Sequence, residues 1–296
     1  MKNSLLFSVF FLIIIQSTYA QEWSSLLDSI DKYKEFDPQK SLKFGFQALE
    51  KTNFDEISYN LYDLNFKIAS VFYLAKNYEK SFQFLTTSLS IYELLPIKER
   101  RYKFIKKPPW LLALLGNVYF RLGRYERAKK IYNEAIINFN LIEEKEEKNY
   151  GLNTSDDSLG NIYLDQNDSD EAEKYYKRSL ERRINFGKVS DIMFSYSLLT
   201  KLYFKINKIE LGLKYLKLAE ELFENSKTNS KSETPIFYSK TISAYASYLK
   251  TNGEILKALD LFKKAKNLIK YYPDLHLQDV NFSISECFYE LKKYNQ

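Results

Sequence analysis

The chain has 296 residues, and 44 Lys and Arg against 38 Asp and Glu give it a formal charge of +6. A single Cys and a single His exclude an internal disulfide and a Cys/His zinc site. Eight Gly and six Pro are too few for a collagen-like or Gly/Pro-rich disordered chain and disfavour a turn-rich β fold, whereas 45% hydrophobic residues are enough for a sizeable core.

Residues 1–20 have the three-part layout of a secretory signal peptide. A basic start precedes the apolar stretch Leu5–Ile15, and Thr18 and Ala20 place small residues before a cut after Ala20. An uncleaved membrane anchor is the alternative, but a spanning helix needs about 20 apolar residues, more than this stretch contains. We therefore expect export through a cleaved signal, and a periplasmic or secreted protein that begins at Gln21.

The rest of the chain repeats itself. Residues 115–119 and 159–163 both read Leu-Gly-Asn, then Val or Ile, then Tyr. In each copy an alanine follows the glycine by 12 residues and a tyrosine follows it by 16. A degraded copy covers residues 41–48, and three further copies keep small and large residues at the same offsets. Their residues in the glycine position are Ala69, Thr200 and Ala246.

Each copy has the pattern of two short amphipathic helices. Apolar residues recur at steps of three and four, which is the helical period. Small residues such as Gly116 let the two helices approach closely, and large ones such as Tyr119 and Tyr132 fill the space between them. Gly123 or Asn167 lies at the break, where a left-handed residue ends a helix at low cost. Such pairs bury their apolar faces by stacking on their neighbours.

These residues resemble the tetratricopeptide repeat family, and the resemblance covers nearly all of the chain after residue 20. It implies an all-α fold, a right-handed α-solenoid of about five to six stacked antiparallel helix pairs plus a terminal helix. The anchors are 40 (160 to 200) to 47 (69 to 116) residues apart rather than the usual ~34, which resembles the long units of kinesin light chain-type arrays. The expected units cover residues 24–52, 56–95, 106–142, 150–186, 190–225 and 236–270, followed by a terminal helix at 275–293.

The excess length is expected in loops, at residues 108–109, in the charged run 143–148 and at residues 226–235. The terminal helix carries an apolar stripe on one face, formed by Leu277, Val280, Ile284, Cys287 and Leu291. A solenoid needs a capping helix at its end, and the stripe favours that interpretation. The alternative is the first helix of a further unit in a longer array, of the kind that precedes a membrane span and a signalling module.

In this family the first helix of each pair lines a concave groove, so the resemblance implies that residues at matching positions bind a peptide or protein segment. Asn117 and Asn161, each directly after the small anchor, are expected to exchange hydrogen bonds with a peptide backbone. The other expected groove residues are aromatic or cationic, which suits apolar and acidic peptide residues: Phe66, Tyr73, Phe120, Arg121, Phe194, Lys201, Phe204, Lys205, Phe282 and Tyr289. The alternative for each aromatic is packing between neighbouring helices. The family's carboxylate clamp is not expected, because Asp63, Ala113 and Asp157 stand where cations are needed.

Residues 98–107 contain six cations and one acid. They would attract an anionic partner, such as an acidic protein or membrane headgroups, or would form a solvated loop. Residues 165–170 lack the Gly and the bidentate Glu of an EF-hand calcium loop, so we expect a turn in which Asp168 caps a helix. His276 and Cys287 are 11 residues apart, about 16 Å along a continuous helix, which excludes a Cys/His dyad. No catalytic motif is found, and paired acids are expected on exposed helix faces.

The sequence therefore predicts a non-catalytic, exported interaction scaffold without cofactor or metal, which binds a protein or peptide in its groove. One alternative is a sensor or input component of a bacterial signal-transduction system with a membrane-bound signalling partner, and another is an enzyme with an unrecognised site. Nucleic acid is not an expected partner, because the excess of positive charge is small and spread out. Abundant Lys, Asn, Ile and Tyr are typical of an AT-rich bacterial genome.

Overall fold

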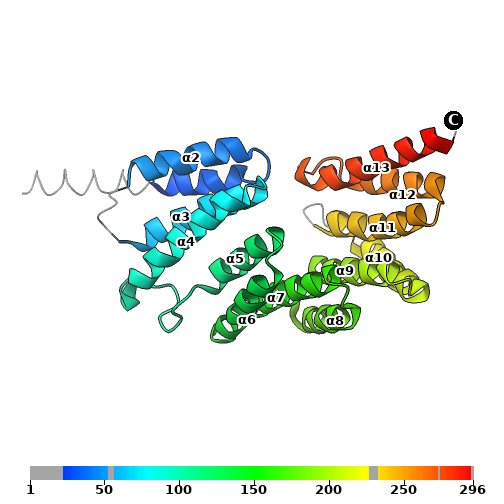
Figure 1. Cartoon of the computed structure of the whole chain (residues 1–296). Coiled ribbons are helices and arrows are strands. Elements are labelled where there is room, and N and C mark those ends of the chain that lie inside the picture. Colours follow the sequence, from blue (N-terminus) through cyan, green and yellow to red (C-terminus); the bar gives the residue numbers. More distant parts are fainter. Residues whose placement is uncertain (1–22, 53–56, 227–232, 273, 295–296) are drawn as a thin grey trace, which may run out of the picture. The chain divides into compact units, whose positions relative to one another are not determined.

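The computed structural model describes residues 23–52, 57–226, 233–272 and 274–294, and every regular element in these ranges is helical (Figure 1). The expected signal peptide lies outside the described residues. The chain divides into two compact units, one that ends at Gly123 and one that begins at Arg124. None of the helices that the structure describes combines the length and apolarity of a membrane span.

The first unit consists of helices that each pack against the next one along the chain, and α3 also contacts α5. The shared core contains Ile30, Leu64, Ile68 and Phe72. A helix at residues 23–33 opens the unit. The elements that follow are α2 (Pro38–Glu50), α3 (Tyr59–Leu74), α4 (Tyr78–Leu94), the short 3₁₀ helix η1 (Ile97–Glu99) and α5 (Pro109–Arg121).

The second unit is built in the same way, from antiparallel pairs that stack on their neighbours. Besides the contacts within pairs, α9 packs directly on α11, and α11 contacts α13. The elements are α6 (Tyr125–Asn140), α7 (Lys145–Asp165), α8 (Ser169–Phe186), α9 (Val189–Lys205), α10 (Ile209–Ser226), α11 (Thr234–Thr251), α12 (Ile255–Leu268) and α13 (Asp274–Tyr294). The prediction of an all-α fold of stacked helix pairs is confirmed in the described part of both units.

In five of the pairs, the turn places a residue with a positive φ angle seven positions after the small anchor. This position is taken by Lys76 (φ 60°), Gly123 (69°), Asn167 (62°), Asn207 (58°) and Gly253 (83°). In four of these turns the next residue donates its backbone N–H to a carbonyl five residues earlier, as in Glu254 N to Leu249 O at 2.9 Å. These are Schellman-type helix ends, which a left-handed residue permits.

The small anchors allow the close helix contacts that the repeat pattern predicts. A Cβ atom at Gly160 on α7 would lie 2.5 Å from the Tyr176 ring on α8. Ala172 is fully buried on α8, and Ala246 is fully buried on α11. Gly151 adds a contact that the repeat does not predict, since its Cβ would lie 2.1 Å from the Phe139 ring on α6.

The charged run 143–148 is not the loop that its composition predicts. It holds the start of α7, because the Glu144 carboxylate accepts a hydrogen bond from the N–H of Glu146 at 2.8 Å and caps the helix. Glu146 and Glu147 lie in the first turn, where a helix N-terminus stabilises negative charge. The turn at residues 165–170 agrees with the prediction, because the Asp168 carboxylate accepts from Glu171 N at 3.2 Å and caps α8.

The apolar stripe predicted for the terminal helix packs on the rest of the second unit. Val280 and Cys287 are buried in a core with Phe262 of α12 and Ala246 of α11. Leu277, Ile284 and Leu291 pack against the same core. The opposite face of α13 is open, with Phe282 66% and Tyr289 63% exposed.

Candidate functional site

The first helices of the pairs carry the residues that the sequence predicts for binding. In the second unit these helices are α7, α9, α11 and α13. Phe194 on α9 and Phe237 on α11 meet with their ring centroids 5.0 Å apart. The Lys240 ammonium lies 5.5 Å from the Phe237 centroid and 6.0 Å from that of Phe194. We call Phe194, Phe237, Lys240 and the neighbouring Lys201 the aromatic–cation site.

The two lysines of this site form no hydrogen bond or ion pair with any residue that the structure describes, and both are exposed. Although Lys240 reaches solvent, the surrounding helices desolvate its ammonium and lower its pKa. Asp279 and Glu233 act in the opposite direction, and the charge of Lys201 lowers the pKa of Lys240 further. A bound anion next to Lys240 would stabilise its charged form, because the attraction would offset both the desolvation of the ammonium and its repulsion by Lys201.

A buried ion pair lies next to the aromatic–cation site and holds one of its rings in place. Arg183, at the end of α8, donates to Asp157 of α7 at 2.6 Å, and the two side chains are only 4% and 5% exposed. Its Nη1 also donates to Ser179 at 2.6 Å and to Ser195 of α9 at 2.8 Å. The same guanidinium lies 5.1 Å from the Phe194 centroid. Arg183 therefore joins three helices and fixes the ring that faces α11.

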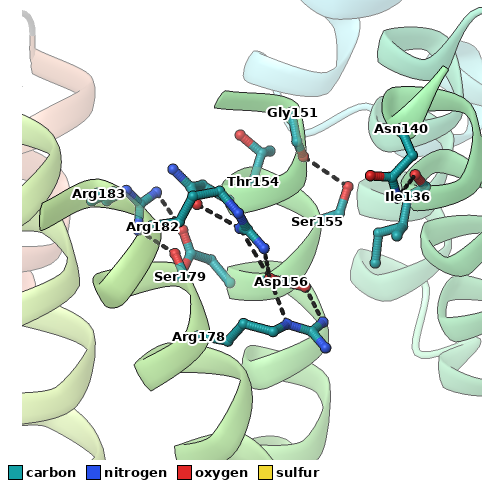
Figure 2. Close-up of polar contacts among 12 residues, drawn as sticks. Ile136, Asn140, Gly151, Thr154, Ser155, Asp156, Arg178, Ser179, Arg182 and Arg183 are labelled. Atoms are coloured by element: carbon teal, nitrogen blue, oxygen red, sulfur yellow. Dashed lines mark hydrogen bonds and ion pairs between the residues drawn. The ribbon is translucent and has the colours of Figure 1, made fainter. Parts of the chain in front are cut away.

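A second ionic cluster lies beside this pair. Figure 2 shows Arg178 and Arg182, both on α8, converging on Asp156 of α7. Arg178 Nε donates to one carboxylate oxygen at 2.9 Å, and Arg182 Nη2 donates to the same oxygen at 3.1 Å. Arg182 Nη1 also donates to Asn153 Oδ1 at 2.7 Å.

The expectation that paired acids lie on exposed faces is wrong for Asp156 and Asp157, which, counted as whole residues, are 1% and 3% exposed. Burial raises the pKa of Asp157, and the charge of Arg183 opposes that rise. The sequence contained one usable hint, because Arg178, Arg182 and Arg183 fall on the following helix, in reach of an acidic pair. Asp157 Oδ1 and Arg183 Nε have no hydrogen-bond partner among the described residues.

Asn161 is partly engaged within the fold. Its side-chain oxygen accepts a hydrogen bond from the Tyr176 hydroxyl at 2.8 Å, which ties α7 to α8. Asn161 and Asn117 are both half-buried. A backbone contact made by Asn161 would therefore use its Nδ2 group, because the oxygen already has a partner. The role of the two asparagines in binding stays a prediction.

The groove residues predicted in the first unit lie on α3 and α5 and make contacts with one another. The Arg121 guanidinium lies 5.8 Å from the Phe120 centroid, and its Nε approaches the Tyr73 hydroxyl at 3.5 Å. Phe66 stacks on Tyr62, with 6.3 Å between ring centroids. These side chains are not fully buried, so they remain candidates for a binding surface.

Phe204 and Lys205 serve the packing of the second unit. Phe204 is 5% exposed, and its ring stacks on Tyr245 and Tyr248 at 5.0 and 5.1 Å. It is a packing residue rather than part of an open surface, which corrects its assignment to the groove. Lys205 Nζ donates to the Leu164 carbonyl at 2.8 Å and so ties α9 to the end of α7.

The described residues contain no group of three or more His, Cys, Asp or Glu that could hold a metal ion. Cys287 is buried, and burial raises the pKa of its thiol. A thiol with a raised pKa is a poor nucleophile at neutral pH. The side chain of His276 lies outside the described residues.

Comparisons with known proteins agree with the repeat architecture. The family model described as Tetratricopeptide repeat matches residues 109–139, and a second model with the same description matches residues 157–189. No curated protein matches the chain.

Solved structures similar to this chain share its fold at low sequence identity. A Rap protein complexed with Competence and Sporulation Factor has a TM-score of 0.62 at 16% identity, with 92% of this chain and 74% of that chain covered. Aspartyl phosphate phosphatase F from Bacillus subtilis has a TM-score of 0.61 at 18% identity, with 93% of this chain and 69% of that chain covered. The Rap conjugation gene regulator of the plasmid pLS20, in complex with the Phr* peptide, has a TM-score of 0.59 at 14% identity, with 92% of this chain and 85% of that chain covered.

Proposed function

Because the chain is a tetratricopeptide repeat protein, we propose that it is a non-catalytic scaffold that binds an extended peptide or protein segment on its first helices. Preformed, stacked helices hold their side chains in place, so little ordering entropy is lost on binding. The complex of a similar structure with a peptide supports the proposal at the level of the fold. The observation that carries it is the aromatic–cation site.

The chemistry of this site selects the kind of segment. The Phe194 and Phe237 rings offer an apolar contact, and aromatic side chains supply large contact energies at interfaces. Lys201 and Lys240 offer two cations without an ion-pair partner among the described residues. We therefore propose a segment in which an acidic residue follows or precedes an apolar one. The carboxylate would lie between the lysines and the apolar side chain against the rings.

The test is binding of short fluorescein-labelled peptides that combine Asp or Glu with Leu or Phe, measured by fluorescence anisotropy. Lys201→Glu/Lys240→Glu is expected to weaken binding by about tenfold or more, because each reversal replaces attraction with repulsion. Lys214→Glu/Lys266→Glu makes the same change in net charge on the second helices and serves as the matched control. Equal affinity of both variants, at equal thermal stability, would contradict the placement of the site.

We also propose that the protein is exported after cleavage behind Ala20. The layout of residues 1–20 supports this proposal. The mass of the protein purified from its source cells tests it, because a cleaved chain begins at Gln21. Affinity capture from envelope extracts would then separate the scaffold from the alternative role as a signalling input, for which the captured partner would be a membrane-bound regulator.

A further inference from the structure

The connection between α4 and α5 exposes apolar side chains among basic ones. We call residues 94–107 the basic loop. Phe104 is 91% exposed, and Leu94 and Ile97 are 66% and 62% exposed. Lys98, Lys103 and Lys106 are exposed as well, and none of them pairs with a residue that the structure describes. The packing of the first unit gives no reason for a phenylalanine to lie in water at this point.

The basic loop follows α4 (Figure 1), and side-chain contacts of Arg100 hold its start. Arg100 donates from Nε to the Leu95 carbonyl at 3.1 Å and from Nη2 to the Glu93 carbonyl at 2.9 Å. Its guanidinium also lies 5.4 Å from the Tyr92 centroid. Ile105 is 3% exposed, and its backbone N–H donates to the Tyr102 carbonyl at 3.1 Å. The exposure of Phe104 is therefore fixed by the contacts of its neighbours.

Anionic lipid surfaces attract such an arrangement. Apolar side chains enter the boundary between headgroups and acyl chains, and each lysine near the surface adds electrostatic attraction. The unpaired cations of the loop are lysines, whose compact charge on a flexible stem needs no fixed partner geometry. A bilayer likewise needs no pocket shaped for Phe104. A protein partner would need both a pocket and matching acids.

We propose that the basic loop binds the surface of an anionic bilayer, with Phe104 and Ile97 inserted and Lys98, Lys103 and Lys106 at the headgroups. This surface lies in the first unit and does not depend on the aromatic–cation site of the second unit. The two proposals can therefore fail separately.

The test is co-sedimentation with vesicles of phosphatidylcholine, with and without phosphatidylglycerol. All proteins begin at Gln21, because the described fold begins at residue 23 and the apolar residues 5–15 would bind vesicles themselves. The wild type is expected to sediment with anionic vesicles and much less with neutral ones, and added salt should weaken binding. Phe104→Ser should lower the partition coefficient by about tenfold. Lys103→Glu/Lys106→Glu should lower it by at least about tenfold.

Two variants control for exposed aromatics and for charge elsewhere. Phe36→Ser removes another exposed ring, 71% exposed, and Lys43→Glu/Lys130→Glu makes the same change in net charge outside the loop. Both should bind as the wild type does, with thermal midpoints within error of it. Equal sedimentation of all variants, or equal binding to neutral vesicles, would overturn the proposal. Binding of poly-glutamate that Phe104→Ser retains and the lysine reversal loses would also overturn it, in favour of an acidic protein.

Discussion

At the scale of single residues, different amino acids occupy the same position of the turn between paired helices. The position with positive φ holds Gly at 123 and 253, Asn at 167 and 207, and Lys at 76. Glycine takes this conformation without strain, Asn tolerates it, and a side chain such as that of Lys is strained by about 1 kcal/mol. The pair of α3 and α4 therefore carries a local strain that the pair of α11 and α12 avoids.

This difference predicts opposite effects of exchanging the residues. Gly253→Ala should destabilise the protein by about 1 kcal/mol, because a Cβ there meets no atom within 4 Å and only the backbone strain remains. Lys76→Gly should stabilise it by several tenths of a kcal/mol, since relief of strain exceeds the added flexibility of the unfolded chain. Urea unfolding measures both. A loss of stability in both variants would contradict the prediction, because it would show that backbone strain at positive φ does not determine the stability of these turns.

At the scale of helices, the sequence predicts what depends on spacing and misses what depends on contacts between chosen side chains. Small and large residues at fixed offsets place the helix pairs, and Gly123 and Asn167 mark the turns of two of them. The start of α7 could not be predicted in this way. A run of charged residues is typical of a loop, and only the structure shows that Glu144 caps the helix. The Asp157–Arg183 pair could not be predicted either, because burial of an acid follows from the position of Arg183 on another helix.

The two neighbouring aspartates allow a matched test of these ionic contacts. Asp157→Asn should destabilise the protein by about 3–5 kcal/mol, because it leaves the buried Arg183 charge without a counterion. Asp156→Asn should have a smaller effect, about 1 kcal/mol, because the side chains of its two partners, Arg178 and Arg182, are 46% and 18% exposed and water can hydrate them. Asp157→Leu/Arg183→Met should recover most of the loss. Denaturant unfolding decides, and equal losses for the two single variants would contradict the difference in burial.

At the scale of the whole molecule, each helix contacts helices close to it in the sequence, as in α9 with α10 and α11. An array with such contacts unfolds from local weak points, because its stability is a sum of unit and neighbour terms. Asp157→Asn should therefore raise amide hydrogen exchange most in α7, α8 and α9. The increase should fade toward α12 and leave α2 and α3 as protected as in the wild type. Mass spectrometry of peptides after exchange measures this pattern. A uniform rise along the chain would mean that the described helices unfold as one cooperative block, and the strain of Lys76 would then weaken the second unit as much as the first.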